Sequence, residues 1–335
     1  HFFQMVGLVQ QDNKMYVKER FELANESKIR DIEPVFGYNG FGEYIFYKSY
    51  SRLMYQDNQP YANEQWHDCV IRVINGVMSI RKDHYVRNNI EWDEERWQIY
   101  AENMGVAMAR MEWLPPGRGL WAMGSDVVYE RGSMPLYNCS YSEIGLTWVE
   151  DLCWIMDCLM NGVGVGFGPV NTGLELQAPT MQHTFVVPDT REGWVDSVRA
   201  LLLAFEIGGS VPIFDYSLVR PAGSPIKSFG GIASGPAPLE RLHITITELC
   251  YKYINVTDYA ETTFKCDLAN LIGVCVISGN VRRSAEIALG EHDDEVFWSL
   301  KNYTKHGRYC TSNGQWLRSG LSQHEELTTW SPWEI

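Results

Sequence analysis

The sequence lacks three features that would each assign a protein to a broad class. It contains no apolar run long enough to cross a bilayer, no C-x-x-C pair, and no cysteine–histidine spacing typical of zinc sites. It is also poor in positive charge, with 28 Lys and Arg against 42 Asp and Glu. We therefore expect no membrane span and no metal site. The net charge of -14 excludes a protein that coats nucleic acid, because such binding needs clustered cations, whereas a mononucleotide needs only a local site.

A disulfide framework and a secretory signal are also lacking. The 8 cysteines are scattered through 335 residues, mostly in apolar segments where a free thiol packs as a small hydrophobic group. The first residues, His1 to Met5, do not form a basic region followed by an apolar stretch and a cleavage site. We therefore predict a cytoplasmic protein in a reducing compartment. The histidine at position 1 suggests an incomplete amino terminus.

The first third of the chain shows the periodicity of amphipathic helices. Apolar residues recur at helical spacing from Gln65 to Ile80 and again from about Asp93 to Met111. Pro115-Pro116 ends the second helix. The length of the chain allows one large domain or two.

After Pro115, glycine-rich turns alternate with compact apolar segments. Residues 149–160 and 194–206 are predicted helices, while 284–289 alternate as in a strand with one wet face. This order predicts an α/β architecture. The tail after Tyr309 has no clear period.

Three glycine-rich or basic segments are candidate ligand loops. The glycines of 162–168 follow a helix, which does not match a dinucleotide-binding turn; they allow either close backbone approach to a ligand or a tight helix-to-strand turn. The 220–236 segment is long and rich in Gly and Pro, as in binding loops or solvated surface loops, and Lys227 could hold a phosphate there. Arg282 and Arg283 suit phosphate or carboxylate, with surface ion pairs as the alternative.

One cysteine differs from the others in its surroundings. Cys139 lies in a short polar segment, Leu136-Tyr137-Asn138-Cys139-Ser140, after a Gly-Ser-Met-Pro turn. It is the first candidate for a chemically active thiol, although thiol reactivity depends on an environment that the sequence does not show.

Taken in order, several segments resemble ribonucleotide reductases. The segments are 36–43 (FGYNGFGE), 113–124 (WLPPGRGLWAMG), 187–194 (VPDTREGW) and the two basic loops. The similarity runs from about Asp31 to about His306 and is greatest to the monomeric, adenosylcobalamin-dependent, triphosphate-reducing type. Any single motif could arise by chance, but the ordered set is highly specific.

The resemblance implies a fold. Family members have a ten-stranded α/β barrel built from two antiparallel halves, preceded by a mainly helical region. Residues 1–112 would form the helical region and 113–309 the first half-barrel with its substrate and effector loops. Residues 310–335 do not match, as in a truncated or frame-shifted product.

The resemblance also implies roles for individual residues. Cys139 matches the cysteine that reduces the substrate together with a partner far downstream. The implied substrate-binding residues are Met123, Gly124, Ser125, Asn138 and Gly164. The implied effector and specificity residues are Ser224, Lys227, Gly230, Asn280, Arg282 and Arg283.

The implied chemistry is the conversion of ribonucleoside triphosphates to deoxyribonucleotides. A dithiol that closes to a disulfide delivers the two electrons needed to replace the ribose 2′-hydroxyl with hydrogen. In the family, cleavage of the adenosylcobalamin cobalt–carbon bond makes a thiyl radical on another cysteine, a deoxynucleotide acts as effector, and thioredoxin or a similar dithiol supplies electrons. The thiyl cysteine, its Asn and Glu neighbours and the partner of Cys139 would lie beyond this chain, so we expect no turnover by the chain alone.

Two other functions remain open at this point. One is a nucleotide-binding fragment without catalytic activity. The other is a large-subunit fragment of a diiron-partnered ribonucleoside-diphosphate reductase, because the visible residues do not themselves distinguish triphosphate from diphosphate substrates.

Overall fold

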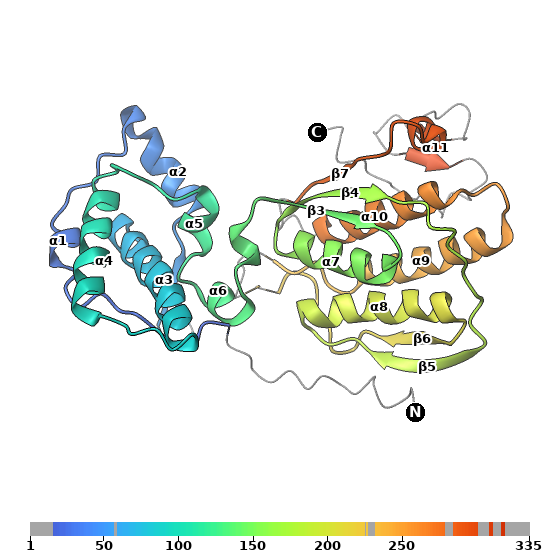
Figure 1. Ribbon diagram of the computed structural model, residues 1–335, viewed down its shortest axis with the longest axis horizontal. Coiled ribbons are helices and arrows are strands. Elements are labelled where there is room, and N and C mark those ends of the chain that lie inside the picture. Colours follow the sequence, from blue (N-terminus) through green and yellow to red (C-terminus); the bar gives the residue numbers. More distant parts are fainter. Residues whose placement is uncertain are drawn as a thin grey trace. The chain divides into compact units, whose positions relative to one another are not determined.

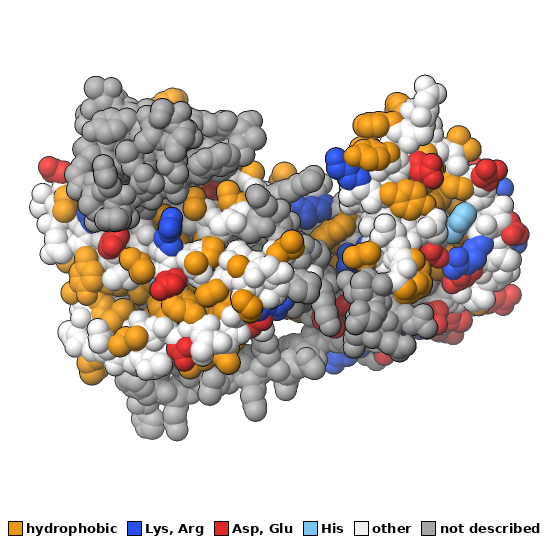
Figure 2. All heavy atoms as spheres, turned by 180° about the vertical axis from the view of Figure 1, so that it is seen from behind, with side chains coloured by type: hydrophobic (Ala, Val, Ile, Leu, Met, Phe, Trp, Pro, Cys, Tyr) orange, Lys and Arg blue, Asp and Glu red, His pale blue; other side chains and the backbone are white. Residues whose placement is uncertain are grey.

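A computed structural model of the chain describes residues 16–56, 59–224, 226, 232–278 and 284–300, and the backbone of 308–310 and 316–318. The chain divides into two compact units, His1–Tyr137 and Asn138–Ile335, whose helices and longer strands are labelled in Figure 1 where there is room. No described helix is both long and apolar enough to pass through a membrane. On the described part of the face seen in Figure 2, Lys and Arg side chains are scattered among acidic and apolar ones.

The first unit is mainly helical. Its elements are α1 (Ser27–Arg30), η1 (Tyr38–Gly40), α2 (Phe41–Ser49), β1 (Leu53–Gln56), β2 (Gln59–Asn63), α3 (Trp66–Arg87), α4 (Glu94–Ala109), α5 (Gly117–Ala122), α6 (Asp126–Arg131) and η2 (Met134–Leu136). The two helices predicted from periodicity are confirmed as α3 and α4, although α3 continues to Arg87. Asp93 caps α4 by accepting a hydrogen bond from the Arg96 backbone N–H at 3.0 Å.

A buried apolar stripe on α3 forms the core of the first unit. Val70, Val73 and Ile74 are almost completely buried and belong to the same cluster as Trp97 and Met108 of α4. The methionines and tryptophan on the α4 stripe are thus mainly core residues, as their spacing predicts.

The turn after α5 lies against the backbone of α3. A Cβ atom at Gly76 would be 2.3 Å from the Gly124 nitrogen, and one at Gly124 would be 2.1 Å from the Arg72 carbonyl oxygen. The Arg72 side chain also donates to the carbonyl oxygens of Leu120, at 2.8 Å, and Met123, and pairs with Glu64 at 2.6 Å. Two glycines and one arginine therefore hold this turn in place.

The second unit alternates strands and helices, which confirms the predicted α/β architecture. Its elements are β3 (Cys139–Ile144), α7 (Trp148–Met160), β4 (Gly164–Pro169), β5 (Met181–Val186), α8 (Arg191–Ile207), β6 (Ser210–Asp215), α9 (Ala237–Asn255), α10 (Glu261–Ile277), β7 (Glu286–Ala288), α11 (Glu295–Ser299), β8 (Arg308–Cys310) and β9 (Trp316–Arg318). Parallel pairing joins β3, β4 and β7 in that order and joins β5 to β6, while β8 and β9 pair antiparallel.

Two expectations for this unit concern the glycine run and the barrel. The glycine run makes the helix-to-strand turn that was one of its two alternatives: Gly162, at φ +74°, makes the turn after α7, and Gly164 begins the central strand β4. The described strands form small sheets of two or three strands.

A buried ion pair fastens the loop after β4 to the start of α10. Lys265 is fully buried; its Nζ lies 2.7 Å from a Glu261 oxygen and donates to the Val170 carbonyl oxygen at 2.6 Å. The Glu261 carboxylate accepts from the backbone N–H groups of Thr172, Gly173 and Leu174 at 2.9 to 3.1 Å. Although burial alone raises the pKa of a carboxyl group, the hydrogen bonds from Lys265 and the loop outweigh it and lower the pKa of Glu261 to about 2.

We predict that Glu261→Gln lowers the free energy of unfolding by about 3 kcal/mol at pH 7, because it leaves the buried Lys265 without its counter-charge. Urea denaturation of this variant and of Glu150→Gln tests this. Glu150 pairs with Arg199 but is 60% exposed, so its loss should cost less than about 1 kcal/mol.

The same pair predicts a dependence on pH. The pKa of Glu261 is lowered in the folded state, so its stabilisation is present above about pH 4.5 and is lost as the pH falls towards 2. The difference between wild type and Glu261→Gln should therefore shrink between pH 6 and pH 3. An equal difference at both pH values would contradict the assignment.

We also predict that Gly124→Ala destabilises the first unit by more than about 2 kcal/mol, since the residue has φ +75° and the new Cβ would overlap the Arg72 carbonyl. Gly40→Ala is the matched control: its φ is +87°, but a Cβ there meets nothing within 4 Å. Thermal unfolding should show a clearly smaller loss for the control, and equal losses would mean that the contact with α3 is unimportant.

Candidate functional site

The candidate site lies on one face of the β3–β4–β7 sheet. Helices α7 and α10 cover the opposite face, towards which the buried Val165 and Phe167 point. Parallel register places Cys139 beside Gly164, and Tyr141 beside Gly166 and then Ile287. The open face is therefore bordered by side chains of β3 and β7, with glycines of β4 between them.

Three residues expected at the substrate site come together at the start of this sheet. The Gly164 N–H donates to the Asn138 carbonyl oxygen at 2.8 Å, which aligns the first residues of β3 and β4. A Cβ atom at Gly164 would meet only the carbonyl oxygens of Asn138 and Ala285, at 3.4 and 3.7 Å. Cys139, beside Gly164, is exposed. A ligand can thus approach the backbone closely next to a thiol.

Cys139 is the one exposed thiol among the seven cysteines that the structure describes. Burial raises the pKa of Cys69 and of Cys153 to about 12, and that of Cys158 to about 11. These buried thiols therefore stay protonated at neutral pH and behave as core residues, as the sequence predicts. Exposure distinguishes Cys139 as the accessible nucleophile or reductant in the described part of the chain.

Three further expected substrate residues, Met123, Gly124 and Ser125, lie in the first unit. Ser125 is buried, and its hydroxyl donates to the Ala122 carbonyl oxygen at 2.6 Å. The Met123 carbonyl is bound by Arg72. The structure thus describes a well-held turn whose polar atoms are partly used within the turn itself.

The expected effector loops are described only at their edges. The Ser224 carbonyl oxygen accepts from the Ala233 N–H at 2.8 Å, and the Gly223 N–H donates back to Ala233 at 3.0 Å. Two backbone hydrogen bonds therefore join the two ends of the 220–236 segment. The expected effector residues outside the described part of the chain are Lys227, Gly230, Asn280, Arg282 and Arg283.

A buried polar network was not foreseen from the sequence. Tyr216 donates to His243 Nδ1 at 2.8 Å, His243 Nε2 lies 2.9 Å from Ser197 Oγ, and Ser197 donates to the Trp194 carbonyl at 2.7 Å. Because Ser197 uses its proton on the Trp194 carbonyl, it accepts from His243, which places the imidazole proton on Nε2. Burial lowers the pKa of His243 to about 3, so the ring stays neutral at physiological pH. Ser197 is fully buried and its proton is already donated, so its hydroxyl is not an accessible nucleophile. The network instead holds α8, α9 and the end of β6 together.

The strand β7 carries a second unforeseen feature. Glu286 is buried, and neither carboxylate oxygen has a hydrogen-bond partner in the described structure. Burial raises its pKa well above the usual value for a carboxyl group. On the opposite face, Ile287 and Leu289 are nearly half exposed. Glu286 thus faces α10, where Gly273 leaves room for its carboxylate, while Ile287 faces the open side.

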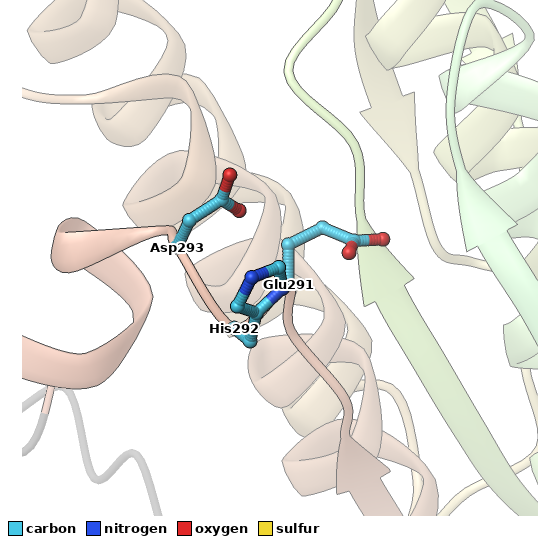
Figure 3. A group of neighbouring side chains, drawn as sticks. All are labelled: Glu291, His292 and Asp293. Carbon is cyan, nitrogen blue, oxygen red and sulfur yellow. The ribbon is translucent and has the colours of Figure 1, made fainter.

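The exposed residues Glu291, His292 and Asp293 bring their possible ligand atoms within 4.8 Å of one another, between β7 and α11 (Figure 3). They are consecutive residues on the surface, and none is fixed by a buried partner. Acidic groups of this kind are common without a bound ion, so they carry no metal assignment.

Two family models match separate parts of the chain. Residues 24–125 match the ribonucleotide reductase alpha domain, and residues 165–250 match the insertion domain of B12-dependent ribonucleotide reductase. The second match covers β4 from Val165 on, the whole of α8, and α9 as far as Cys250.

Curated relatives agree with these matches. The chain is 36% identical to a probable adenosylcobalamin-dependent ribonucleoside-triphosphate reductase of Dictyostelium discoideum, over 92% of this chain and 44% of the relative. It is 39% identical to an adenosylcobalamin-dependent ribonucleoside-triphosphate reductase of Euglena gracilis, over 85% of this chain and 40% of the relative. The chain therefore spans less than half the length of these relatives.

A solved structure has the same fold. The crystal structure of a B-12 dependent (class II) ribonucleotide reductase matches with a TM-score of 0.65 and 23% identity, over 84% of this chain and 46% of that one. The two matched regions and the sequence relatives thus agree in making the chain similar to B12-dependent ribonucleotide reductases.

Proposed function

We propose that this chain contributes to an adenosylcobalamin-dependent ribonucleoside-triphosphate reductase in which Cys139 is one of the two reducing thiols. The observation that carries the proposal is the position of Cys139: it is exposed at the start of β3, beside a glycine that leaves the backbone open. The names of the relatives support the substrate class.

The overall reaction balances with a dithiol as the reductant. The ribose 2′-hydroxyl leaves as water, a carbon–hydrogen bond takes its place, and two thiols lose two hydrogen atoms as they form a disulfide. Cys139 supplies one thiol, and a second cysteine must come within disulfide distance of it. The described cysteines other than Cys139 are buried and do not offer that partner.

The remaining parts of the proposal rest on the resemblance. Adenosylcobalamin, when bound, supplies the radical that starts such a reaction. We assign none of the described residues to the corrin ring, and therefore derive no step through it. Thioredoxin or a similar dithiol would reduce the disulfide, a monomer would carry out the reaction, and its location would be cytoplasmic.

The proposed architecture follows the same resemblance. Residues 1–112 would form a helical region, 113–309 half of a ten-stranded barrel, and 310–335 a tail outside the match. Met123, Gly124 and Ser125 would line the substrate site. Ser224, Lys227, Gly230, Asn280, Arg282 and Arg283 would bind or transmit the deoxynucleotide effector.

We predict that iodoacetamide modifies Cys139 first among the described cysteines, because the other six are buried and those with assigned pKa values stay protonated. Peptide mapping by mass spectrometry after brief labelling of the folded chain checks this. Equal early labelling of Cys153 would show that burial does not protect it.

We further predict that Cys139→Ser in the full-length protein abolishes dithiol-dependent formation of deoxynucleotide, while binding of ribonucleoside triphosphate persists. A serine hydroxyl has nearly the size of a thiol but cannot form the disulfide. Product analysis and equilibrium binding measure the two effects, with Cys153→Ser as a buried-cysteine control. Retained reduction with a dithiol would refute the role of Cys139, whereas binding without turnover in wild type would favour a non-catalytic nucleotide-binding protein.

A further inference from the structure

We propose that Tyr141 is a substrate-positioning residue: its ring bounds a shelf over Gly164 and holds the nucleotide sugar above the Cys139 thiol. This inference rests on the proposed function. It names a residue that the motifs of the sequence do not single out.

The side chain of Tyr141 lies across the central strand. A Cβ atom added to Gly166 would be 3.2 Å from the Tyr141 ring, and one added to Gly168 would be 2.6 Å from the Tyr141 hydroxyl. The ring therefore extends over Gly166 towards Gly168, in the direction away from Cys139. The Tyr141 ring thus leaves no room for a side chain at Gly166 or Gly168, which accounts for two of the three glycines on this face of β4.

The third glycine is left uncovered. Among the described residues, the nearest atoms to a Cβ on Gly164 are two backbone carbonyl oxygens at 3.4 and 3.7 Å, and no described side chain is within 4 Å. The shelf thus begins at Cys139 and ends at the Tyr141 ring. Cys139 and Tyr141 are two residues apart on one strand, which separates them by about 7 Å, a spacing that fits a five-membered sugar ring.

The surroundings of Tyr141 favour the sugar over the phosphates as its neighbour. Tyr141 is 52% exposed, so its ring is not simply a core residue. Burial of the hydroxyl and the nearby carboxylates of Glu143 and Glu291 together raise the pKa of Tyr141. These carboxylates would repel a triphosphate from the far end of the ring. The phosphates should therefore extend from the shelf on the side away from Tyr141.

The test compares Tyr141→Ala, Tyr141→Phe and Gly164→Ala in the full-length protein. Tyr141→Ala should raise the KM for a ribonucleoside triphosphate about tenfold, the effect expected from loss of one aromatic contact. Tyr141→Phe keeps the ring and should recover most of that loss. Gly164→Ala fits without overlap but fills the shelf, so it should raise KM even if Tyr141→Ala fails to fold. Tyr44→Ala, at a tyrosine 55% exposed in the first unit, is the matched control and should leave KM unchanged.

A second measurement does not need turnover. Ribonucleoside triphosphate should protect Cys139 from iodoacetamide, and half-protection should need about tenfold more nucleotide in Tyr141→Ala. Unchanged KM and protection in both Tyr141→Ala and Gly164→Ala would overturn the inference, as would a loss in Tyr141→Phe equal to that in Tyr141→Ala. If the Tyr141 variants behave in this way while Cys139→Ser still abolishes reduction, only the role of Tyr141 is refuted. If Cys139→Ser retains reduction, the proposed function itself is refuted.

Discussion

The parallel pairing of β3 with β4 is the constraint on which the candidate site depends. Parallel neighbours cannot be joined by a tight turn, and here α7 makes the connection and buries Leu152, Ile155 and Met156. The hydrogen bond from Gly164 to Asn138 then sets the register. A shift by one residue would turn Cys139 towards the helices and replace an accessible thiol with a buried one.

Glycine recurs at the contacts that shape both units, but for different reasons. Gly76 and Gly124 let two backbones touch in the first unit. Gly166 leaves space for the Tyr141 ring, and Gly164 leaves space that no side chain of the described residues fills. The same residue type therefore marks tight packing in one place and an open surface in another, and only the neighbouring atoms tell the two apart.

Charge burial in the second unit follows two opposite patterns. The Lys265–Glu261 pair is fully satisfied by loop backbone groups, which keeps Glu261 ionised and fastens the β4–β5 connection to α10. Glu286 is buried on β7 without a described partner and favours its neutral form. The first acid keeps its charge through its partners, whereas burial without a described partner disfavours the charge of the second.

The sequence by itself determined the helices α3, α4, α7 and α8, the α/β class and the distinctive setting of Cys139. Helical periodicity and local polarity are properties of neighbouring residues, so they can be read without a fold. Other features depended on tertiary contacts. The alternation of residues 284–289 predicted a strand, but only the packing of α10 decided that Glu286 is buried and Ile287 exposed. Likewise, Tyr141 and the His243 network had no sequence signal, because their partners lie 25 to 46 residues away along the chain and meet only when strands and helices pack.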